Sequence, residues 1–304
     1  MEPVPVGAAS EAVTPAWPAV ARDYATLTKP RIMSLLVLTS VCAMLAAAGG
    51  KPRPLALLAL IVGGALACGG ASALNHVLDR DIDRLMGPRT ATRPVAAGRI
   101  APGHAVAFGL VLSAIAFGIL ATFDNLLAAA LSLGGGAFYV IVYTLWLKRS
   151  TSQNIVIGGA AGAIPPLAGW AAAHGSLGVG AVLLFGIVLL WTPPHFWSLA
   201  LLLAPRYEAA NVPMLPVVRG PTATARQMLA YTVALTLLTL VPVAVGTFGT
   251  LYLVCAALLG AVFCVLAWRL WRQGTAARAA VLFHYSLLYL ALLFVAVAVD
   301  AAIR

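Results

Sequence analysis

Long apolar runs recur nine times along the chain, and each is close to the length of a membrane-crossing helix. A spanning helix needs about 20 mostly apolar residues, whereas a transmembrane β-barrel shows short segments of alternating polarity. The sequence therefore predicts an all-α, polytopic membrane protein with about nine transmembrane helices. The predicted spans cover residues 32–48, 55–78, 105–123, 126–147, 154–173, 179–203, 229–248, 251–270 and 280–299.

The composition excludes a soluble enzyme and a disordered chain. Of the 304 residues, 62% are hydrophobic and 9% are charged, against about 25% charged residues in an ordinary soluble domain. The four cysteines lie within apolar runs and show neither CxxC nor Cys/His spacing. They are expected to be small buried apolar residues, so the sequence predicts neither a disulfide framework nor a zinc site.

Basic residues gather on one side of the predicted membrane domain. Lys and Arg number 19 and Asp and Glu 9, a formal charge of +10. With the N-terminus inside, all the basic residues except Lys51, Arg53 and Arg304 lie on the inner side. We expect the protein in the cell membrane, where the positive-inside rule predicts a cytoplasmic N-terminus and an outer C-terminus. Because this rule accounts for the basic residues, we expect no nucleic-acid partner.

The start of the chain is rich in Ala, Pro and Val and lacks the basic start and apolar core of a cleaved signal. We expect residues 1–23 to form a flexible cytoplasmic tail. Residues 24–304 are then expected to form one intramembrane domain.

The strongest polar cluster lies where the second span meets the inner surface. Asn75, Asp79 and Asp83 are spaced i, i+4, i+8, so they share one face of a helix that continues from this span. Two carboxylates and an amide oxygen suit Mg²⁺, which completes its shell with water and substrate phosphate. Asp81 falls on another face and is expected to pair with a nearby Arg. Alternatively, the acids are interfacial residues balanced by neighbouring arginines.

Several cations are predicted on the same side of the membrane as these acids. Each alone is explained as a positive-inside anchor. Together with the carboxylates they could neutralise a diphosphate from both sides and help it to leave. No Walker-type glycine loop is present, so a nucleotide is not expected. The cations are Arg31, Arg89, Arg93, Lys148 and Arg149.

A second candidate feature is the segment 191–197 in the sixth predicted span. Two consecutive prolines there are expected to break the helix, as are Pro165 and Pro166 in the fifth span. His195 follows the break directly. It could donate a hydrogen bond to a freed carbonyl, act as a base or contact a porphyrin, and Asn154 is expected to line the same interior.

These motifs, in this order, resemble those of the UbiA-type intramembrane prenyltransferases. The resemblance covers about residues 24 to 300, and the acidic motif marks only the superfamily. Two segments, TPPHFW at 192–197 and VPMLPV at 212–217, narrow it to the branch that acts on haem. The other matching motifs are Lys29-Pro30-Arg31, the Asn75/Asp79/Asp83 pattern, Arg89-Thr90 with Arg93-Pro94, Tyr143-Thr144 with Leu147-Lys148-Arg149, and GGAAGAIPP at 158–166.

The resemblance implies a nine-helix bundle around a lipid-accessible cavity. It also implies transfer of the farnesyl group of farnesyl diphosphate to a vinyl group of haem B, giving haem O for terminal oxidases, with haem A synthase or oxidase assembly factors as possible partners. Haem B would be a substrate and Mg²⁺ the cofactor. The implied roles are Mg²⁺ and diphosphate binding for Asn75, Asp79 and Asp83, neutralisation of the diphosphate for Arg31, Arg93, Lys148 and Arg149, and catalysis for Asp79, Asp83 and the haem-side His195.

The sequence departs from the family pattern in two places. The loop from Met86 to Thr90 is one residue longer than expected, and Arg206 stands where the family normally places an Asp before a Tyr. A second Mg²⁺ carboxylate is therefore missing at that position. Either Glu208 replaces it, or Arg206 binds phosphate directly.

Two other functions are compatible with parts of the pattern. One is prenylation of an aromatic ring or another tetrapyrrole by a related UbiA-type enzyme. The other is transport, since broken helices and interior polar groups also mark transport sites. Transport is disfavoured because the polar cluster lies at the inner surface rather than at the bilayer midplane, and because no inverted repeat is evident.

Overall fold

The computed structural model describes residues 17–304, except the side chains of Arg31 and Ile32, and every regular element within this range is a helix. The all-α prediction is confirmed. The elements are α1 (Trp17–Leu27), α2 (Pro30–Ala47), α3 (Pro54–Leu78), α4 (Arg80–Leu85), α5 (Pro88–Ala91), α6 (Pro102–Phe123), α7 (Leu126–Ala137), the π-helix η1 (Phe138–Leu147), α8 (Lys148–Ser150), α9 (Asn154–His174), α10 (Val179–Leu202), α11 (Ala204–Ala209), α12 (Leu215–Ala244), α13 (Thr250–Gln273) and α14 (Ala276–Ile303).

Within the described residues, eight helical stretches are long and apolar enough to cross a membrane. They are α3, α6, the continuous stretch α7–η1–α8, α9, α10, α12, α13 and α14. The first predicted span is occupied by α2, whose described apolar part, Met33–Ala47, is shorter. Each predicted apolar run is thus helical, and the chain is a multi-span membrane protein.

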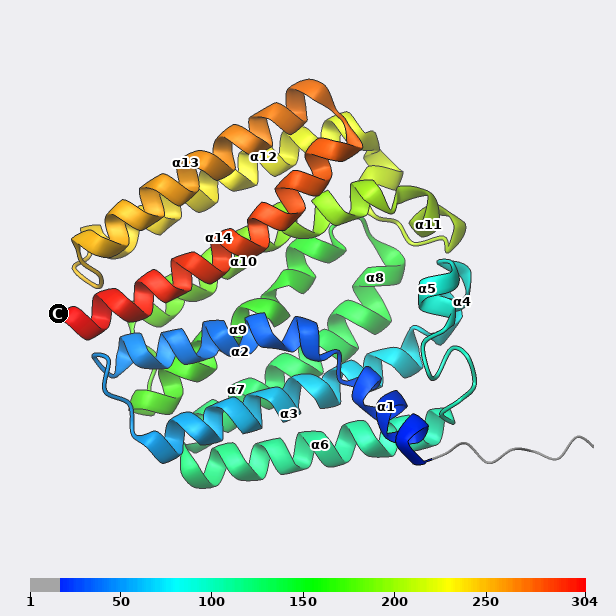
Figure 1. Cartoon of the computed structure of the whole chain (residues 1–304), viewed down its shortest axis with the longest axis horizontal. Helices are drawn as coiled ribbons and strands as arrows, with labels where there is room; N and C mark the ends of the chain where they lie inside the picture. Colours follow the sequence, from blue (N-terminus) through cyan, green and yellow to red (C-terminus); the bar gives the residue numbers. More distant parts are fainter. Residues whose placement is uncertain (1–16) are drawn as a thin grey trace, which may run out of the picture.

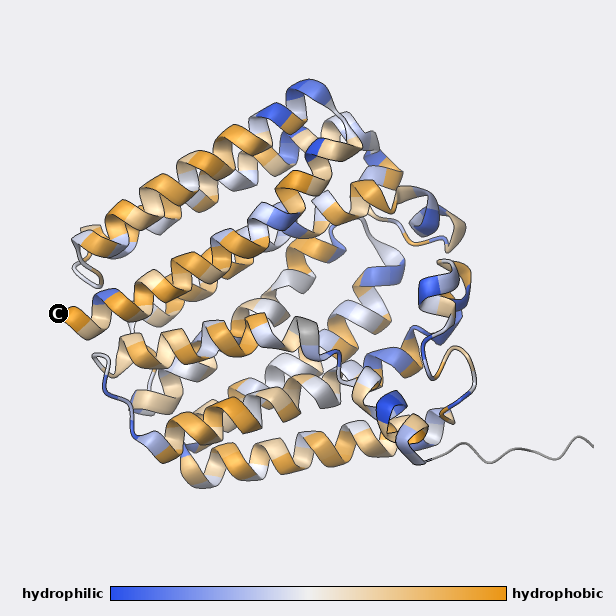
Figure 2. Cartoon of the chain, in the orientation of Figure 1, coloured by the Kyte–Doolittle hydropathy of each residue, from blue (hydrophilic) through white to orange (hydrophobic). Residues whose placement is uncertain are grey.

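The long helices lie side by side, and the short helices α4, α5 and α11 gather at one end of the bundle near α1 (Figure 1). In Figure 2 the long helices are mainly apolar, while hydrophilic residues concentrate at this end. Among the long helices, α10 packs against α9, α12 and α14, and α2 packs against α9 and α14. The arrangement brings segments distant in sequence to one polar end of the bundle.

Close packing, rather than burial of apolar surface, holds such a bundle together, because lipid tails are as apolar as the side chains. The largest fully buried side chains lie on α10, α13 and α14, among them Trp197, Tyr252, Phe263 and Tyr289. On α9, Gly169 faces the backbone of Ser40, and a Cβ at this position would overlap the Ser40 carbonyl. Glycine therefore sets the close approach of α9 to α2.

The prediction that paired prolines break the fifth and sixth spans is wrong. Helix α9 continues through Pro165 and Pro166, and α10 continues through Pro193 and Pro194. A proline inside a helix removes one backbone bond, but neighbouring helices make this tolerable in a membrane protein. Both prolines of the α10 pair are buried against such neighbours.

The expected tail, residues 1–23, is only partly within the described residues. Residues 1–16 lie outside them, and residues 17–23 form the first part of α1 rather than a loose segment. Three contacts hold α1 to the bundle. Asp23 accepts two hydrogen bonds from Arg99, at 2.8 and 2.9 Å, the Tyr24 ring lies 4.9 Å from that of Phe108, and the Leu27 carbonyl accepts a hydrogen bond of 2.7 Å from Ser72. These distant partners cannot be identified from the local sequence.

Candidate active site

The acidic cluster forms where α3 gives way to α4. Asp79, between the two helices, departs from helical geometry (φ −89°, ψ 3°), so the single helix predicted here is two helices. The backbone bonds Asp79 N to Asn75 O (2.9 Å) and Asp83 N to Asp79 O (2.8 Å) nevertheless carry the i, i+4 spacing across the junction. The three side chains are buried, with exposed fractions of 2%, 2% and 1%.

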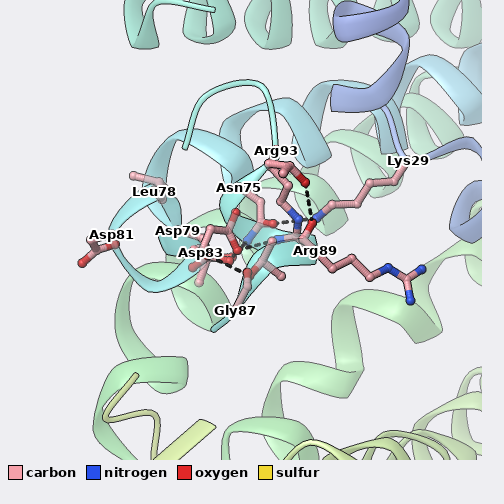
Figure 3. A network of polar contacts seen from close by, with 12 residues as sticks. Lys29, Asn75, Leu78, Asp79, Asp81, Asp83, Gly87, Arg89 and Arg93 are labelled. Carbon is pink, nitrogen blue, oxygen red and sulfur yellow. Dashed lines mark hydrogen bonds and ion pairs between the residues drawn. The ribbon is translucent and has the colours of Figure 1, made fainter. Parts of the chain in front are cut away.

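Each carboxylate of this cluster is paired with a cation that the sequence singles out. The Lys148 Nζ atom lies 2.5 Å from Asp79 Oδ2. The Arg93 Nη1 atom lies 2.6 Å from Asp83 Oδ1, and both of these residues are drawn in Figure 3. The sequence predicted acids and bases on opposite sides of a phosphate. In this structure they contact one another directly, which compensates the buried charges.

Asn75 connects three elements through its side-chain amide. Its Oδ1 atom accepts a hydrogen bond from Lys29 Nζ at 2.8 Å, and its Nδ2 atom donates to Asp79 Oδ2 (2.8 Å) and to Thr144 Oγ1 (3.1 Å). Lys29, which directly precedes α2, has a left-handed backbone (φ 51°). Neither Lys29 nor Thr144 was predicted to have a role, although both lie within the motifs Lys29-Pro30-Arg31 and Tyr143-Thr144.

One oxygen of each carboxylate remains without a partner. Asp79 Oδ1 and Asp83 Oδ2 are buried and accept no hydrogen bond from the described residues. Buried polar atoms are normally satisfied, and Mg²⁺ typically takes one or two carboxylates together with substrate phosphate oxygens. The described residues contain no group of three or more His, Cys, Asp or Glu that could hold a metal unaided. The donor set therefore fits Mg²⁺ shared with a phosphorylated substrate.

Burial and the repulsion between like charges shift the pKa values of Asp83 and Lys29 at this site. Burial raises the pKa of Asp83, against the opposing effect of Arg93. Burial also lowers the pKa of Lys29 to about 7, and the positive charge of Arg93 contributes in the same direction. A bound anion would favour the protonated form of Lys29.

The π-helix η1 brings the fourth span to this cluster. Long π-helices are rare, and short ones are frequent at functional sites. Within η1 the Thr144 hydroxyl donates to the Tyr139 carbonyl, five residues earlier, at 2.9 Å, and the Tyr139 and Tyr143 rings stack with centroids 5.6 Å apart. Glycine at position 158 admits the Tyr143 ring, since a Cβ there would overlap it. The π-helix ends next to Lys148.

Two of the remaining predicted cations, Arg89 and Arg149, do not join the cluster. Arg149 donates two hydrogen bonds of 2.7 Å to Asp81 and one of 2.8 Å to the Leu78 carbonyl. The expected pairing of Asp81 with an arginine is thus confirmed, and Asp81 points away from the cluster in Figure 3, as does Arg89. The contact with Arg149 holds the pKa of Asp81 below its usual range. The side chain of Arg31 lies outside the described residues.

Helix α11 supplies two further side chains near the cluster. The Arg206 side chain lies beside Gly87: a Cβ atom added to Gly87 would be 3.9 Å from both Cδ and Nε of Arg206. Arg206 makes no ion pair within the described residues. Burial raises the pKa of Tyr207 to about 12, partly opposed by the charge of Arg93. Glu208 is exposed. Nothing in the sequence singled out Tyr207, because only the fold brings its hydroxyl near Arg93 and Asp79.

His195 lies in a separate, aromatic environment on α10. Its ring stacks on Trp191 (4.3 Å between centroids, 14° between planes) and on Phe283 from α14 (5.0 Å, 20°). Its Nδ1 atom lies 2.7 Å from Ser286 Oγ. Within the described residues, no hydrogen bond or ion pair connects His195 to the acidic cluster. The structure thus separates His195 from the acidic cluster.

The family model of UbiA prenyltransferases matches residues 36–296. The chain belongs to the UbiA prenyltransferase family. The match covers η1 and most of α14, and Asn75, Asp79, Asp83 and His195 all lie within it.

The relatives of this UbiA-family chain include proteins named protoheme IX farnesyltransferase. The protein from Roseiflexus castenholzii is 50% identical over 286 residues, which are 94% of this chain and 53% of that protein. The protein from Gloeobacter violaceus is 50% identical over 293 residues, 96% of each chain. The chain thus spans about half the length of the Roseiflexus relatives and nearly the whole length of the Gloeobacter relative.

Solved structures of other family members share the fold. A digeranylgeranylglyceryl phosphate synthase matches with a TM-score of 0.77 at 18% identity, over 93% of this chain and 99% of that chain. A UbiA homologue from Archaeoglobus fulgidus, bound to GPP and Mg²⁺, matches with a TM-score of 0.69 at 14% identity, over 90% of this chain and 99% of that chain. At these identities the likeness concerns the fold alone.

Proposed function

We propose that this chain transfers the farnesyl group of farnesyl diphosphate to a vinyl group of haem B and so produces haem O. The observation that carries the proposal is the buried pair of carboxylates, Asp79 and Asp83. Each has one oxygen without a partner and one oxygen paired with a basic side chain. This arrangement suits a metal-bound diphosphate. The choice of farnesyl and haem rests on the 50% identity to protoheme IX farnesyltransferases.

In this proposal Asn75, Asp79 and Asp83 hold Mg²⁺ together with the diphosphate. The free oxygens of the two aspartates support this assignment. When bound, Mg²⁺ supplies positive charge that stabilises the departing diphosphate. The Archaeoglobus homologue, which was solved with GPP and Mg²⁺, makes the same cofactor reasonable for this member of the family.

The chain's own cations complete the neutralisation of the diphosphate. Lys148, Arg93 and Lys29 all donate to acceptors within the cluster. Donors already oriented in a buried site stabilise developing negative charge without much reorganisation. Arg149 contributes from outside by holding the end of α3 through its hydrogen bond to the Leu78 carbonyl, and Arg31 is proposed as a further diphosphate ligand from its place in the motif.

The transfer begins with cleavage of the C–O bond between farnesyl and diphosphate, and the diphosphate leaves with the electron pair. The vinyl carbon of haem B then forms a bond to the allylic cation. Water adds to the resulting cation beside the porphyrin ring and loses a proton, which yields a hydroxyethyl group. Tyr139 and Tyr143, stacked near the cluster, offer aromatic faces that shelter the allylic cation from water.

The proposed location is the cell membrane, with the N-terminus and the diphosphate site at the cytoplasmic face. The positive-inside distribution supports this orientation. Helix α1 and helix α4, which carries Asp83, lie at the same end of the bundle (Figure 1), so one orientation serves both. Haem A synthase or oxidase assembly factors are proposed as downstream partners.

A membrane assay tests this proposal directly. Membranes containing the protein receive haem B, farnesyl diphosphate and Mg²⁺, and the products are analysed by mass. We expect a farnesylhydroxyethyl derivative of haem that disappears when EDTA removes the metal, and that Asp79→Asn membranes do not form. Absence of this product in membranes with folded protein, together with prenylation of an aromatic acceptor, would overturn the assignment of haem.

A further inference from the structure

Ser286 on α14 makes two short hydrogen bonds with its hydroxyl group. The Oγ atom lies 2.6 Å from the Phe283 carbonyl oxygen and 2.7 Å from His195 Nδ1. Ser286 is fully buried, and its own carbonyl accepts a hydrogen bond from Trp191 Nε1 at 2.8 Å. The same residue thus contacts both aromatic rings that α10 directs toward α14.

The single proton of a hydroxyl group decides which tautomer His195 adopts. A carbonyl oxygen cannot donate, so the 2.6 Å contact requires the Ser286 proton to point at Phe283. Without that proton, lone pairs of two oxygens would face each other at this distance. The Ser286 oxygen is left as an acceptor, and His195 must donate from Nδ1.

The surroundings of His195 favour a neutral ring. The imidazole lies between the Trp191 and Phe283 rings, with Phe196 at its edge, and no carboxylate contacts it within the described residues. A buried charge without a partner is strongly disfavoured. With the proton on Nδ1, a neutral ring carries its lone pair on Nε2.

The Nε2 atom of His195 is the end of the ring that remains available. It makes no hydrogen bond within the described residues and is not among their fully enclosed, unpartnered polar atoms. The residue keeps 8% of its surface exposed. A neutral imidazole nitrogen that is oriented by a hydrogen bond on its other nitrogen is a common metal ligand.

We propose that Ser286 is a positioning residue that holds the Nε2 lone pair of His195 ready as an axial ligand for the iron of a metalloporphyrin. The inference rests on the proposed function for the identity of this ligand. Trp191 and Phe283 fix the plane of the ring, and Ser286 fixes its rotation and tautomer. An iron held from one side would place the vinyl groups at a defined position relative to the prenyl donor.

Nitrogen NMR of the purified protein with ¹⁵N-labelled histidine tests the tautomer without any substrate. The His195 resonances are assigned by their loss in His195→Gln. We expect a protonated Nδ1 and an unprotonated Nε2 in the wild type, and loss of this preference in Ser286→Ala. Ser198→Ala is the matched control, because the buried Ser198 hydroxyl donates to the His195 carbonyl at 2.6 Å and not to the ring. A wild-type ring protonated at Nε2 would overturn the proposal.

Titration with haem B, followed by absorption spectroscopy, tests the ligand. We expect a spectrum typical of a nitrogen ligand, its loss in His195→Gly and its recovery when free imidazole is added. Ser286→Ala should weaken haem binding by about 10-fold, the lower end of the usual effect of such an orienting partner. Ser286→Thr, which keeps the hydroxyl, and Ser198→Ala should bind as the wild type does.

The two proposals can fail independently. If wild-type membranes form the farnesylated haem while His195→Gly leaves the haem spectrum unchanged, the iron-ligand inference is wrong and the proposed function stands. If the spectrum depends on His195 and Ser286 but no prenylated haem forms, the proposed function is wrong and the porphyrin site stands.

Discussion

The Lys148 ammonium group lies 2.5 Å from the Asp79 carboxylate, and this buried ion pair joins the end of the fourth span to the junction between α3 and α4. The two residues are 69 positions apart in the sequence. Removing one member of a buried pair leaves an uncompensated charge and costs about 3 to 5 kcal/mol. The contact therefore has consequences for stability that are distinct from those for activity.

Double-mutant analysis separates these two contributions. Lys148→Met should lower the unfolding temperature because Asp79 loses its ion pair. The double variant Lys148→Met, Asp79→Asn should regain most of this stability, since neither buried charge remains, while activity stays lost. Thermal unfolding of the purified variants measures the first effect and the membrane assay the second. Equal stability of the single and double variants would show that the loss of Lys148 does not destabilise the protein through an unpaired Asp79 carboxylate.

The two buried carboxylates should be essential for turnover, whereas their exposed neighbour should not. Asp79→Asn and Asp83→Asn each remove a charge and a candidate metal ligand, so we expect activity to fall by about 100-fold or more. Asp81→Asn is the matched control, because Asp81 pairs with Arg149 on the exposed side of the same turn. It should stay within about two-fold of the wild type, as expected for an exposed pair. Full activity of Asp79→Asn at saturating Mg²⁺ would contradict the metal assignment.

Three glycines of α9 provide a graded test of helix packing. Gly169→Ala should be strongly destabilising, because its Cβ would overlap the Ser40 carbonyl of α2. Gly158→Ala should displace the Tyr143 ring and reduce activity more than stability. Gly162 has open space around it, so Gly162→Ala should be neutral or stabilising by about 0.5 to 1 kcal/mol. Expression level, unfolding temperature and turnover of the three variants give the comparison.

Asp124, between α6 and α7, should make stability depend on pH. Burial raises its pKa from 3.8 to about 6, despite the opposing charge of Arg53, and neither carboxylate oxygen has a partner in the described residues. Between about pH 4 and pH 6 the folded state therefore binds more protons than the unfolded state, so stability falls as the pH rises through this interval.

The variant Asp124→Asn removes this effect. At pH 7.5 it should be more stable than the wild type by about 1 kcal/mol, after allowance for partial exposure. For a chain of this size that corresponds to about 2 to 4 °C in unfolding temperature. The advantage should vanish below about pH 4, and an advantage that persists there would show that burial of the charge is not its cause.

Arg206 should affect how activity depends on Mg²⁺. Arg206→Asp places a carboxylate beside Gly87, where the family pattern leads us to expect one, so activity should rise more steeply with Mg²⁺ concentration than in the wild type. Arg206→Ala is the control for loss of the positive charge alone. Identical Mg²⁺ curves for the Asp and Ala variants would show that this position does not contribute to metal binding.

The sequence predicted the spans well, because hydrophobic length is a local property of the chain. It also placed Asn75, Asp79 and Asp83 on one face, since their backbone bonds keep the helical spacing across the junction. It did not predict the interruption at Asp79. Nor did it predict the continuity of α9 and α10 through their prolines, which depends on packing against other helices.

Partners in the site depend on contacts that local patterns do not encode. Lys29 and Arg31 are both basic and two residues apart, and only the fold shows that Lys29 contacts Asn75 across 46 positions. Similarly, Lys148 and Arg149 are adjacent but contact different aspartates. Ser286 lies 91 positions from His195 in an apolar span, where a single serine carries no signal of its own.

The π-helix between Phe138 and Leu147 determines the direction in which Lys148 leaves the fourth span. Its i to i+5 bonds take up more residues per turn than an α-helix does, and one residue of α-helix corresponds to a rotation of about 100°. If the same 10 residues wound as a regular α-helix, the segment would turn further over its length, and Lys148 would leave the span in a different direction from Asp79. A change of winding that removes no polar side chain would thus be enough to take the cation out of the site.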